Sequence, residues 1–279
     1  MQNRIINDIT SYIDFLRDLN FSVTVSCFDK VLEKHFPILY DYEVHLPAVC
    51  YYLKANAVTC GKCPKNKRKL EKKTITEPYY SCCYAGIEEF VIPIIHDGTL
   101  ICCVNVSGYR GKIPQSKILS NKYSKKLGND FSNLYNMLKT DVPDMNTVLQ
   151  AVKPLEYMFK ALRKECMMST NDGSAASQIY RKSLRYIYDN YMNDFSLKKM
   201  AKSLNYSPSY IRHTFLEQSG KTIHQTITAV RLNQAAVLLK STDFTITRIA
   251  LECGFCDGNY FSTVFKKAYN MTPKEYRKK

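Results

Sequence analysis

Cysteines offer the widest choice of chemistry in this chain, and most of them lie in one part of it. The chain has 279 residues and 11 cysteines, eight of which fall between Cys27 and Cys103. Thiolates bind Zn²⁺ or an iron–sulfur cluster, and a C-x-x-C pair is a common half-site for either. The candidate sensor residues are Cys50, Cys60, Cys63, Cys82 and Cys83.

Three interpretations of these cysteines stay open. A metal site would take Cys50, Cys60, Cys63 and only one of the adjacent pair Cys82 and Cys83, because neighbouring residues on a strand face opposite ways. Of this pair, Cys83 is the candidate ligand. Alternatively, the basic residues at positions 62, 65, 67 and 68 lower nearby thiol pKa values and favour redox switching. Cysteine is also a small, commonly buried hydrophobe. Zinc is therefore a candidate cofactor.

No arrangement of residues in the sequence is typical of an enzyme. His35, His45 and His96 are scattered, and no Gly-rich phosphate loop or nucleophile-elbow pattern occurs. We therefore expect no catalytic residues and a protein that is not an enzyme.

Positive charge is concentrated towards the C-terminal end. The chain has 40 Lys and Arg against 25 Asp and Glu, and from Gln178 onward the counts are 17 and 7. This asymmetry favours a polyanionic partner at that end. The longest apolar runs, residues 90–95 and 100–104, are far shorter than the roughly 18 residues of a membrane span. With no signal-peptide pattern at the N-terminus, we expect a cytoplasmic protein without a membrane partner.

The N-terminal part is predicted to be an α+β domain with an antiparallel sheet. Residues 1–20 place apolar side chains at helical spacing, and residues 21–27 alternate with the period of a strand. Residues 89–95 and 99–106 are rich in β-branched side chains and are joined by His96-Asp97-Gly98, in which Asp-Gly is a strong hairpin signal.

Three segments are predicted along the chain. The first domain covers residues 1–130, and a helical linker or dimerisation segment covers residues 131–177. Within that segment, residues 154–168 are helical and the small-residue run STNDGSAAS covers residues 169–177. Residues 178–279 form a second domain in which every segment is helical.

The second domain contains an internal repeat. The segments LKKMAKSLNY and ITRIALECGF match at an offset of 49 residues, and beyond the next turn the offset is 50. Each copy has an apolar helix with a small alanine, a short turn and a second helix, which is the helix-turn-helix pattern. Ser207-Pro208 and Asp257 cap the second helices. We therefore expect an all-α domain with two helix-turn-helix units.

The second helix of each copy has an apolar and a polar face. Ile211 and Phe215 lie four residues apart and face inward, as do Phe261 and Phe265. The outward faces carry short polar or basic side chains, which helices entering the DNA major groove require. Double-stranded DNA is the expected partner.

Residues 183–277 resemble the DNA-binding domain of the AraC/XylS family of transcription regulators. The most specific stretch is residues 246–276, ITRIALECGFCDGNYFSTVFKKAYNMTPKEY, and Ser207-Pro208-Ser209-Tyr210 and Arg231-Leu232 match as well. The resemblance implies a bacterial transcription regulator, an activator that recruits RNA polymerase. Its two recognition helices would enter successive major-groove segments, joined by a helix over about residues 223–240.

The resemblance also implies, by position, which residues contact DNA. They are Ser209, Arg212, His213, Gly258, Asn259, Thr263, Lys266 and Lys267. Because Gly258 has no side chain and an arginine common at the Thr263 position is missing, the second unit is expected to contribute mainly phosphate contacts through Lys266 and Lys267. Asn270 stands where the family usually has glycine.

Residues 10–112 resemble the PocR sensory domain, a PAS-like module thought to bind small hydrocarbon derivatives. The resemblance implies a regulator, expected to act as a homodimer, whose N-terminal domain responds to a small-molecule effector. The alternative is a regulator whose cysteines sense metal or redox state. The residues that match, with Gly108-Tyr109 in place of the family's Gly-Gln, are Cys50, Cys60 or Cys63, Cys83 and Gly86.

Overall fold

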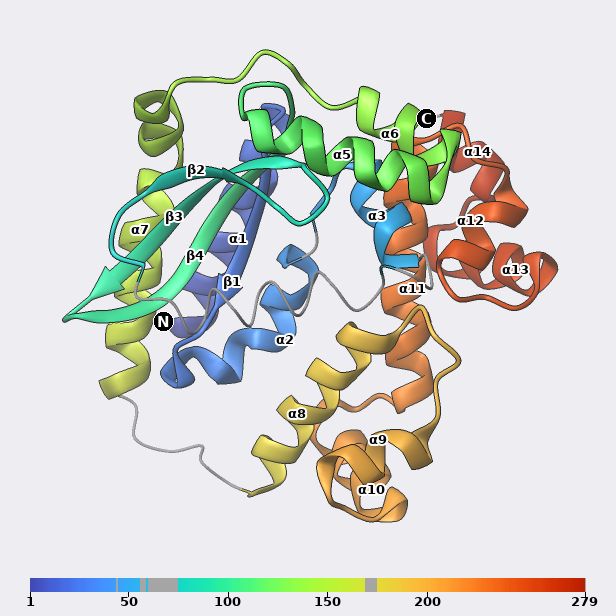
Figure 1. Cartoon of the computed structure of the whole chain (residues 1–279). Helices are drawn as coiled ribbons and strands as arrows, with labels where there is room; N and C mark the ends of the chain where they lie inside the picture. Colours follow the sequence, from blue (N-terminus) through green and yellow to red (C-terminus); the bar gives the residue numbers. More distant parts are fainter. Residues whose placement is uncertain (44, 56–58, 60–74, 169–174, 279) are drawn as a thin grey trace. The chain divides into compact units, whose positions relative to one another are not determined.

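The computed structural model describes residues 1–43, 45–55, 59, 75–168 and 175–278 (Figure 1). It divides into two compact units. The first comprises residues 1–50 and 58–171, and the second comprises residues 51–57 and 172–279. The boundary between residues 50 and 51 falls within the helix α3 (Ala48–Ala55).

The first unit is built on a four-stranded antiparallel sheet in the order β1-β4-β3-β2. β3 and β4 form the predicted hairpin, and its turn residues Asp97 and Gly98 have φ values of +51° and +68°, as a tight two-residue hairpin turn requires. The predicted α+β class and the antiparallel sheet are confirmed. The strands are β1 (Ser22–Cys27), β2 (Tyr79–Cys82), β3 (Glu88–His96) and β4 (Thr99–Tyr109).

Two long helices, α1 (Gln2–Asp18) and α7 (Met145–Met168), lie side by side against the sheet (Figure 1). The Tyr12 hydroxyl donates a hydrogen bond to the Ala151 carbonyl at 2.9 Å. The predicted start of the second of these helices at residue 154 is wrong, because Pro154 lies inside α7. Burial of Val148 and Val152 on the same helical face keeps the preceding turns helical despite the proline.

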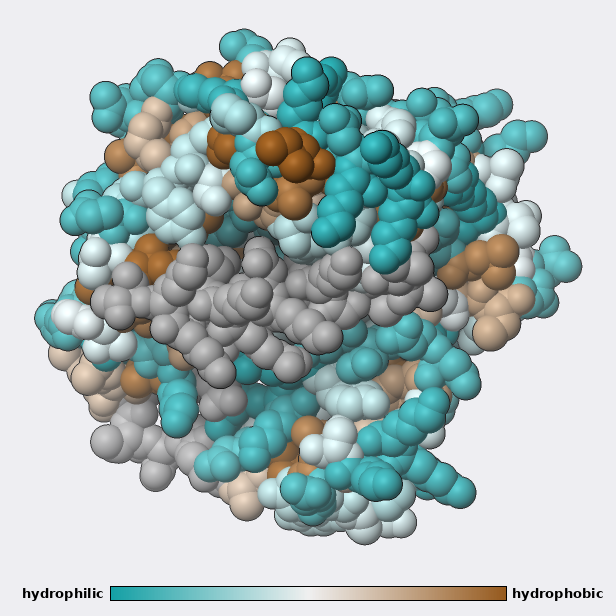
Figure 2. Space-filling model, in the orientation of Figure 1, coloured by the Kyte–Doolittle hydropathy of each residue, from teal (hydrophilic) through white to brown (hydrophobic). Residues whose placement is uncertain are grey.

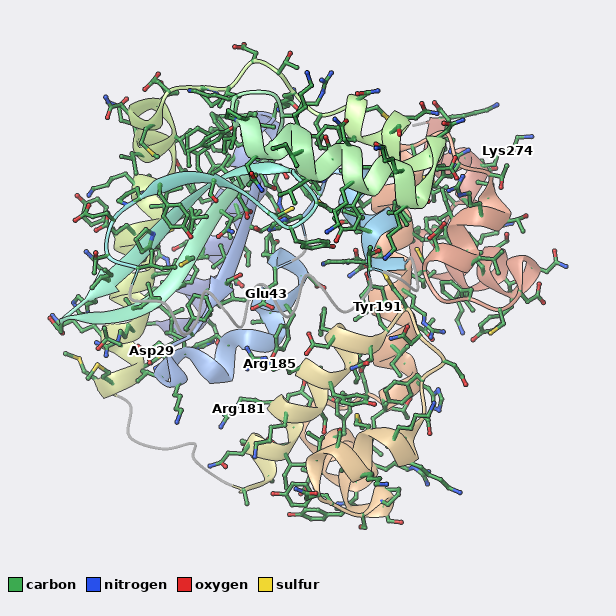
Figure 3. The ribbon with its side chains drawn as sticks, viewed as in Figure 1. Asp29, Glu43, Arg181, Arg185, Tyr191 and Lys274 are labelled. Atoms are coloured by element: carbon green, nitrogen blue, oxygen red, sulfur yellow. The ribbon has the colours of Figure 1, made fainter. Side chains whose placement is uncertain are left out.

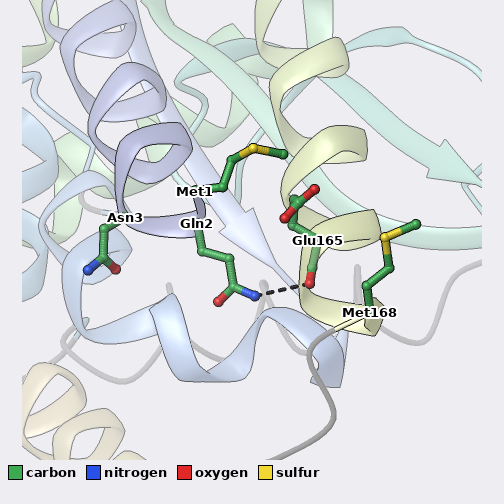
Figure 4. A pocket seen from close by; sticks show the side chains of 5 residues that line it. All are labelled: Met1, Gln2, Asn3, Glu165 and Met168. Atoms are coloured by element: carbon green, nitrogen blue, oxygen red, sulfur yellow. Dashed lines mark hydrogen bonds between the residues drawn. The ribbon is translucent and has the colours of Figure 1, made fainter.

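The C-terminal end of α7 is tied to the N-terminal end of α1. Gln2 Nε2 donates to the Glu165 carbonyl at 3.0 Å (Figure 4), one of the four last carbonyls that have no partner within the helix. The surrounding surface is an open depression lined by Met1, Asn3 and Met168 as well. The C-terminal end of the last helix of the first unit is thus anchored to α1.

Shorter helices complete the first unit. The Ser116 and Tyr135 hydroxyls both donate to the Gly86 carbonyl, at 2.7 and 2.9 Å, and so tie two of these helices to the turn before β3. The helices are η1 (Lys30–His35), α2 (Phe36–Leu39), η2 (Tyr40–Tyr42), α5 (Pro114–Leu127) and α6 (Asn129–Asn136).

The second unit has only helices among its described residues, as predicted. The linker predicted over residues 169–177 lies outside the described residues except for its last three, which begin α8. No helix in the described part of the chain is both long and apolar enough to span a membrane. The helices are α8 (Ala175–Asn190), α9 (Leu197–Leu204), α10 (Pro208–Ser219), α11 (Ile223–Ser241), α12 (Ile246–Glu252), α13 (Gly258–Tyr269) and α14 (Pro273–Lys278).

The internal repeat extends to individual hydrogen bonds. In the turn of the first copy the Tyr206 N–H donates to the Ala201 carbonyl at 3.1 Å, and in the second copy Phe255 donates to Ala250 at 2.9 Å. Both alanines are at most 2% exposed, which lets the helices of each unit approach closely. The predicted pair of helix-turn-helix units is therefore present, as α9–α10 and α12–α13.

Candidate nucleic-acid interface and sensory site

The N-terminal half of α10 carries the first set of predicted DNA-contacting residues. The Ser207 hydroxyl accepts a hydrogen bond from the Tyr210 N–H at 3.2 Å and so caps the helix ahead of Pro208. Ser209, Arg212 and His213 are all exposed. Because Ile211 and Phe215 on the opposite face are at most 1% exposed, packing fixes which face of α10 points outward.

The second set lies on α13. Asp257 caps this helix by accepting a hydrogen bond from the Asn259 N–H at 2.8 Å. Asn259 and Thr263 are exposed one turn apart, and the Thr263 hydroxyl donates back to the Asn259 carbonyl at 3.0 Å. Gly258 is half-buried, and a Cβ added there would make only ordinary contact with Thr247, 3.9 Å away. Packing against α12 therefore does not require glycine at that position.

Basic residues surround these two helix faces. Lys266 and Lys267 are exposed in the last turn of α13. Arg212 is exposed and has no ion-pair partner among the described residues, whereas His213 lies 3.8 Å from Glu217 one turn along. The visible surface over α8 and α9 is largely hydrophilic (Figure 2). The faces of α10 and α13 are thus suited to a polyanion.

Arg231 on α11 joins the segment between α8 and α9 to the turn of the second helix-turn-helix unit. Its guanidinium donates to the carbonyls of Tyr191, labelled in Figure 3, and Asn193 at 2.7 and 3.1 Å, and lies 5.9 Å from the centre of the Phe255 ring. It thus contacts the α8–α9 connection and the turn of the second unit together. The sequence marked Arg231 only as part of a resemblance, because these contacts join segments about 40 residues apart.

Asn270, which departs from the usual glycine, ends α13 in the left-handed conformation with φ of +55°. Gly220 ends α10 in the same conformation with φ of +66°. Asparagine tolerates this region better than other residues with a side chain. The departure therefore preserves the helix end.

The sheet of the first unit has one apolar and one polar face. Strand register puts Val23, Val104 and Ile92 among the residues of the face that packs on α1 and α7. The other face carries Ser22, Thr24, Glu89, Asn105 and Ser107. Although polar, Thr24, Glu89, Asn105 and Ser107 are all at most 6% exposed.

Glu89 and Asn105 form the centre of this buried polar face. Asn105 Nδ2 donates to Glu89 Oε2 at 3.2 Å, and His45 Nε2 lies 3.8 Å from the same oxygen. Burial raises the pKa of Glu89 to about 7, against the opposing effect of the hydrogen bond from Asn105. The Asn105 Oδ1 atom is buried without a hydrogen-bond partner among the described residues.

The sequence did not predict the contact between Glu89 and Asn105, although the strands around it show a pattern of alternating apolar and polar residues. The runs Ser22-Val23-Thr24-Val25-Ser26 and Val104-Asn105-Val106-Ser107 alternate between apolar and polar residues. Such alternation usually marks a strand with one face in water. Only the packing of other segments over the polar face distinguishes a buried site from an ordinary surface.

The cysteines of the first unit are dispersed among different environments. Cys60 and Cys63 lie outside the described residues, so the zinc and redox interpretations stay predictions. Cys50 is buried on α3, whereas Cys82, at the end of β2, and Cys83 are half-buried. No group of three or more His, Cys, Asp or Glu side chains in the described part of the chain is arranged to hold a metal ion.

Three further observations favour structural roles for individual cysteines. Cys102 and Cys103 are fully buried in β4, and burial raises the pKa of Cys103 to about 12, which suppresses thiolate formation. Cys83 Sγ accepts a hydrogen bond from the Ala85 N–H at 3.4 Å. In the same turn Gly86 has φ of +82°, and a Cβ there would lie 2.3 Å from the Ser116 carbonyl oxygen. The segment from Cys83 to Gly86 is therefore a tight turn against α5.

Comparison with known proteins assigns both parts of the chain. Residues 31–167 match the sensory domain found in PocR, and residues 200–279 match a helix-turn-helix domain. The regulatory protein PocR of Salmonella typhimurium is 26% identical over 223 residues, which are 75% of this chain and 74% of that protein.

Two further relatives cover mainly the helix-turn-helix domain. An uncharacterized HTH-type transcriptional regulator from Pseudoalteromonas carrageenovora is 41% identical over 101 residues, 36% of this chain and 59% of that protein's length. The solved C-terminal domain of AraT, a response regulator from Geobacillus stearothermophilus, is 36% identical, with 38% of this chain and 88% of that chain covered and a TM-score of 0.36.

The matches define a protein class in which a sensory domain precedes a double helix-turn-helix DNA-binding domain. By these matches the chain combines a sensory domain of the PocR type with a helix-turn-helix domain of the AraC type.

Proposed function

We propose that this protein is a bacterial, sequence-specific transcription regulator that binds double-stranded DNA and responds to a small organic effector bound by its first unit. The observation that carries the proposal is the repetition of the helix-turn-helix unit, with equivalent hydrogen bonds to Ala201 and Ala250. Two equivalent units joined by one helix suit successive segments of the major groove on one side of DNA. Activation through RNA polymerase and action as a homodimer belong to the same proposal.

Different residues would have different roles on DNA. Arg212, exposed and without an ion-pair partner among the described residues, is suited to bidentate recognition of a guanine. Lys266 and Lys267 at the end of α13 would bind phosphates and add affinity without sequence preference.

The test uses the full chain and a DNA site selected from a random library. We expect Arg212→Ala to weaken binding to the selected site by about 1–3 kcal/mol and to relax preference at one base. Lys267→Ala is the matched control, since it removes a cation from the other recognition helix without altering base preference. A uniform loss of affinity for all sequences in Arg212→Ala would contradict base reading, and no selected site at all would contradict the proposed function.

A further inference from the structure

Glu88 and Glu89 are neighbours in β3, but their carboxylates differ in the number of hydrogen bonds that they accept. Glu88 accepts hydrogen bonds from the Tyr80 hydroxyl at 2.7 Å and from the Ile113 and Lys112 N–H groups at 2.9 and 3.2 Å. It therefore holds the start of α5 and has a structural role. Glu89 has one hydrogen-bond donor among the described residues, Asn105, although its carboxylate can accept about four hydrogen bonds.

A buried polar group that lacks hydrogen-bond partners destabilises the folded protein. A buried polar atom without a partner costs about 1–3 kcal/mol, and a buried charge costs more. The Asn105 carbonyl oxygen carries this cost, and the buried Glu89 carboxylate lies beside it on the same sheet face. A ligand that donates hydrogen bonds to both would remove it.

The remaining residues of this face define the shape of such a ligand. Near Glu89 and Asn105 the face continues with the hydroxyls of Ser22 and Ser107, 3.4 Å apart. At the other end it becomes apolar, where Val91 and Cys103 pack with Ile75. The face therefore offers acceptors at one end and an apolar surface at the other.

We propose that Glu89 and Asn105 are the effector-recognition pair of the sensory domain, and that the effector presents hydroxyl or ammonium donors to them and not a carboxylate. The inference rests on the proposed function, since it assigns the effector site of the same regulator. A carboxylate group placed there would face repulsion from Glu89 and would offer the Asn105 oxygen no donor.

Three two-carbon probes that differ in one end group test the ligand class. Ethylene glycol offers a neutral hydroxyl, ethanolamine an ammonium and glycolate a carboxylate. At 100 mM and pH 8, we expect at least one of the first two to raise the Tm of the full-length protein by about 2–4 °C, and glycolate to raise it less. In Glu89→Gln the effect of ethanolamine should fall and that of ethylene glycol should persist, which distinguishes the two donors.

A double variant separates recognition from stability. Glu89→Leu with Asn105→Leu replaces both polar groups by apolar ones, so the unliganded Tm should be equal or higher while the response to the probes is lost. Should this variant not fold, Asn105→Val alone removes the acceptor and should at least halve the response. Glu156→Gln, a carboxylate on α7, is the control and should respond as the unmodified protein does.

The proposal is overturned by no rise in Tm with either donor probe, by an equal or larger rise with glycolate, or by an unchanged response in the double or backup variant. Gel shifts with the selected DNA site on the same preparations test the proposed function separately. A protein that binds DNA specifically but fails the probe test loses this inference alone.

Discussion

At the scale of single residues, Glu89 shows how far burial changes a common side chain. Its carboxyl is 6% exposed and faces one hydrogen-bonding amide and a histidine 3.8 Å away. Because the ionised form is poorly compensated there, the proton is held up to a pH of about 7 in the folded state, against an ordinary pKa of 4.5.

This shift predicts a pH-dependent stability. Between pH 4.5 and pH 7 the folded state binds more protons at Glu89 than the unfolded state does, so the free energy of unfolding falls as pH rises through this window. The full effect is about 3 kcal/mol, complete above pH 7. Urea unfolding at several pH values should show that Glu89→Gln loses less stability than the unmodified protein between pH 5 and pH 7.5. If the free energies of unfolding of Glu89→Gln and of the unmodified protein change equally with pH, the raised pKa of Glu89 is contradicted.

At the scale of elements, the turns of the second unit show why two glycines with positive φ differ in importance. Gly254, between α12 and α13, and Gly220, after α10, have φ of +86° and +66°. A Cβ at Gly254 would lie 2.9 Å from the carbonyl oxygens of Tyr191 and Met192, whereas nothing lies within 4 Å of one at Gly220. Backbone conformation favours glycine at both positions, but close packing requires it only at Gly254.

Alanine substitutions at these two positions measure the difference. We expect Gly220→Ala to lower the free energy of unfolding by about 1–2 kcal/mol, the cost of the left-handed conformation alone. Gly254→Ala should cost about 1–3 kcal/mol more, because it also forces the α8–α9 connection and Arg231 to move. Thermal unfolding of both variants measures the contrast, and equal losses would mean that the close approach adds nothing.

At the scale of the whole molecule, the distribution of charge couples the protein to its proposed partner. From Gln178 onward the chain has 17 basic and 7 acidic residues, and exposed lysines lie beside the face of α13. Each contact with a phosphate releases bound counterions, so affinity for DNA should fall steeply with salt.

The salt dependence predicts what Lys266 and Lys267 contribute. Removing one phosphate contact should reduce the slope of log affinity against log salt by about 1 in magnitude, so Lys266→Ala and Lys267→Ala should each show this reduction on specific and random DNA alike. Titrations from 50 to 300 mM salt would measure it, with Lys117→Ala on α5 of the first unit as the control. Unchanged slopes would remove these lysines from the phosphate-binding set.

The sequence was sufficient for the features that local chemistry controls. Asp97-Gly98 marked the hairpin, the caps Ser207 and Asp257 marked the recognition helices, and the spacing of Ile211 and Phe215 separated their inner and outer faces. These signals act within a few residues of the chain. The proline at position 154 misled for the opposite reason, because packing outweighed its local preference.

Only the tertiary structure decided which groups meet across long separations. The sequence determined two helix-turn-helix copies and a β-hairpin, since periodicity and turn residues are read within one segment. It could not place Glu89 beside Asn105, or Arg231 against Tyr191 and Phe255, because strand register and helix packing bring these residues together. Burial and its effect on pKa arise from the same assembly, which is why an ordinary glutamate in the sequence becomes a candidate recognition group in the fold.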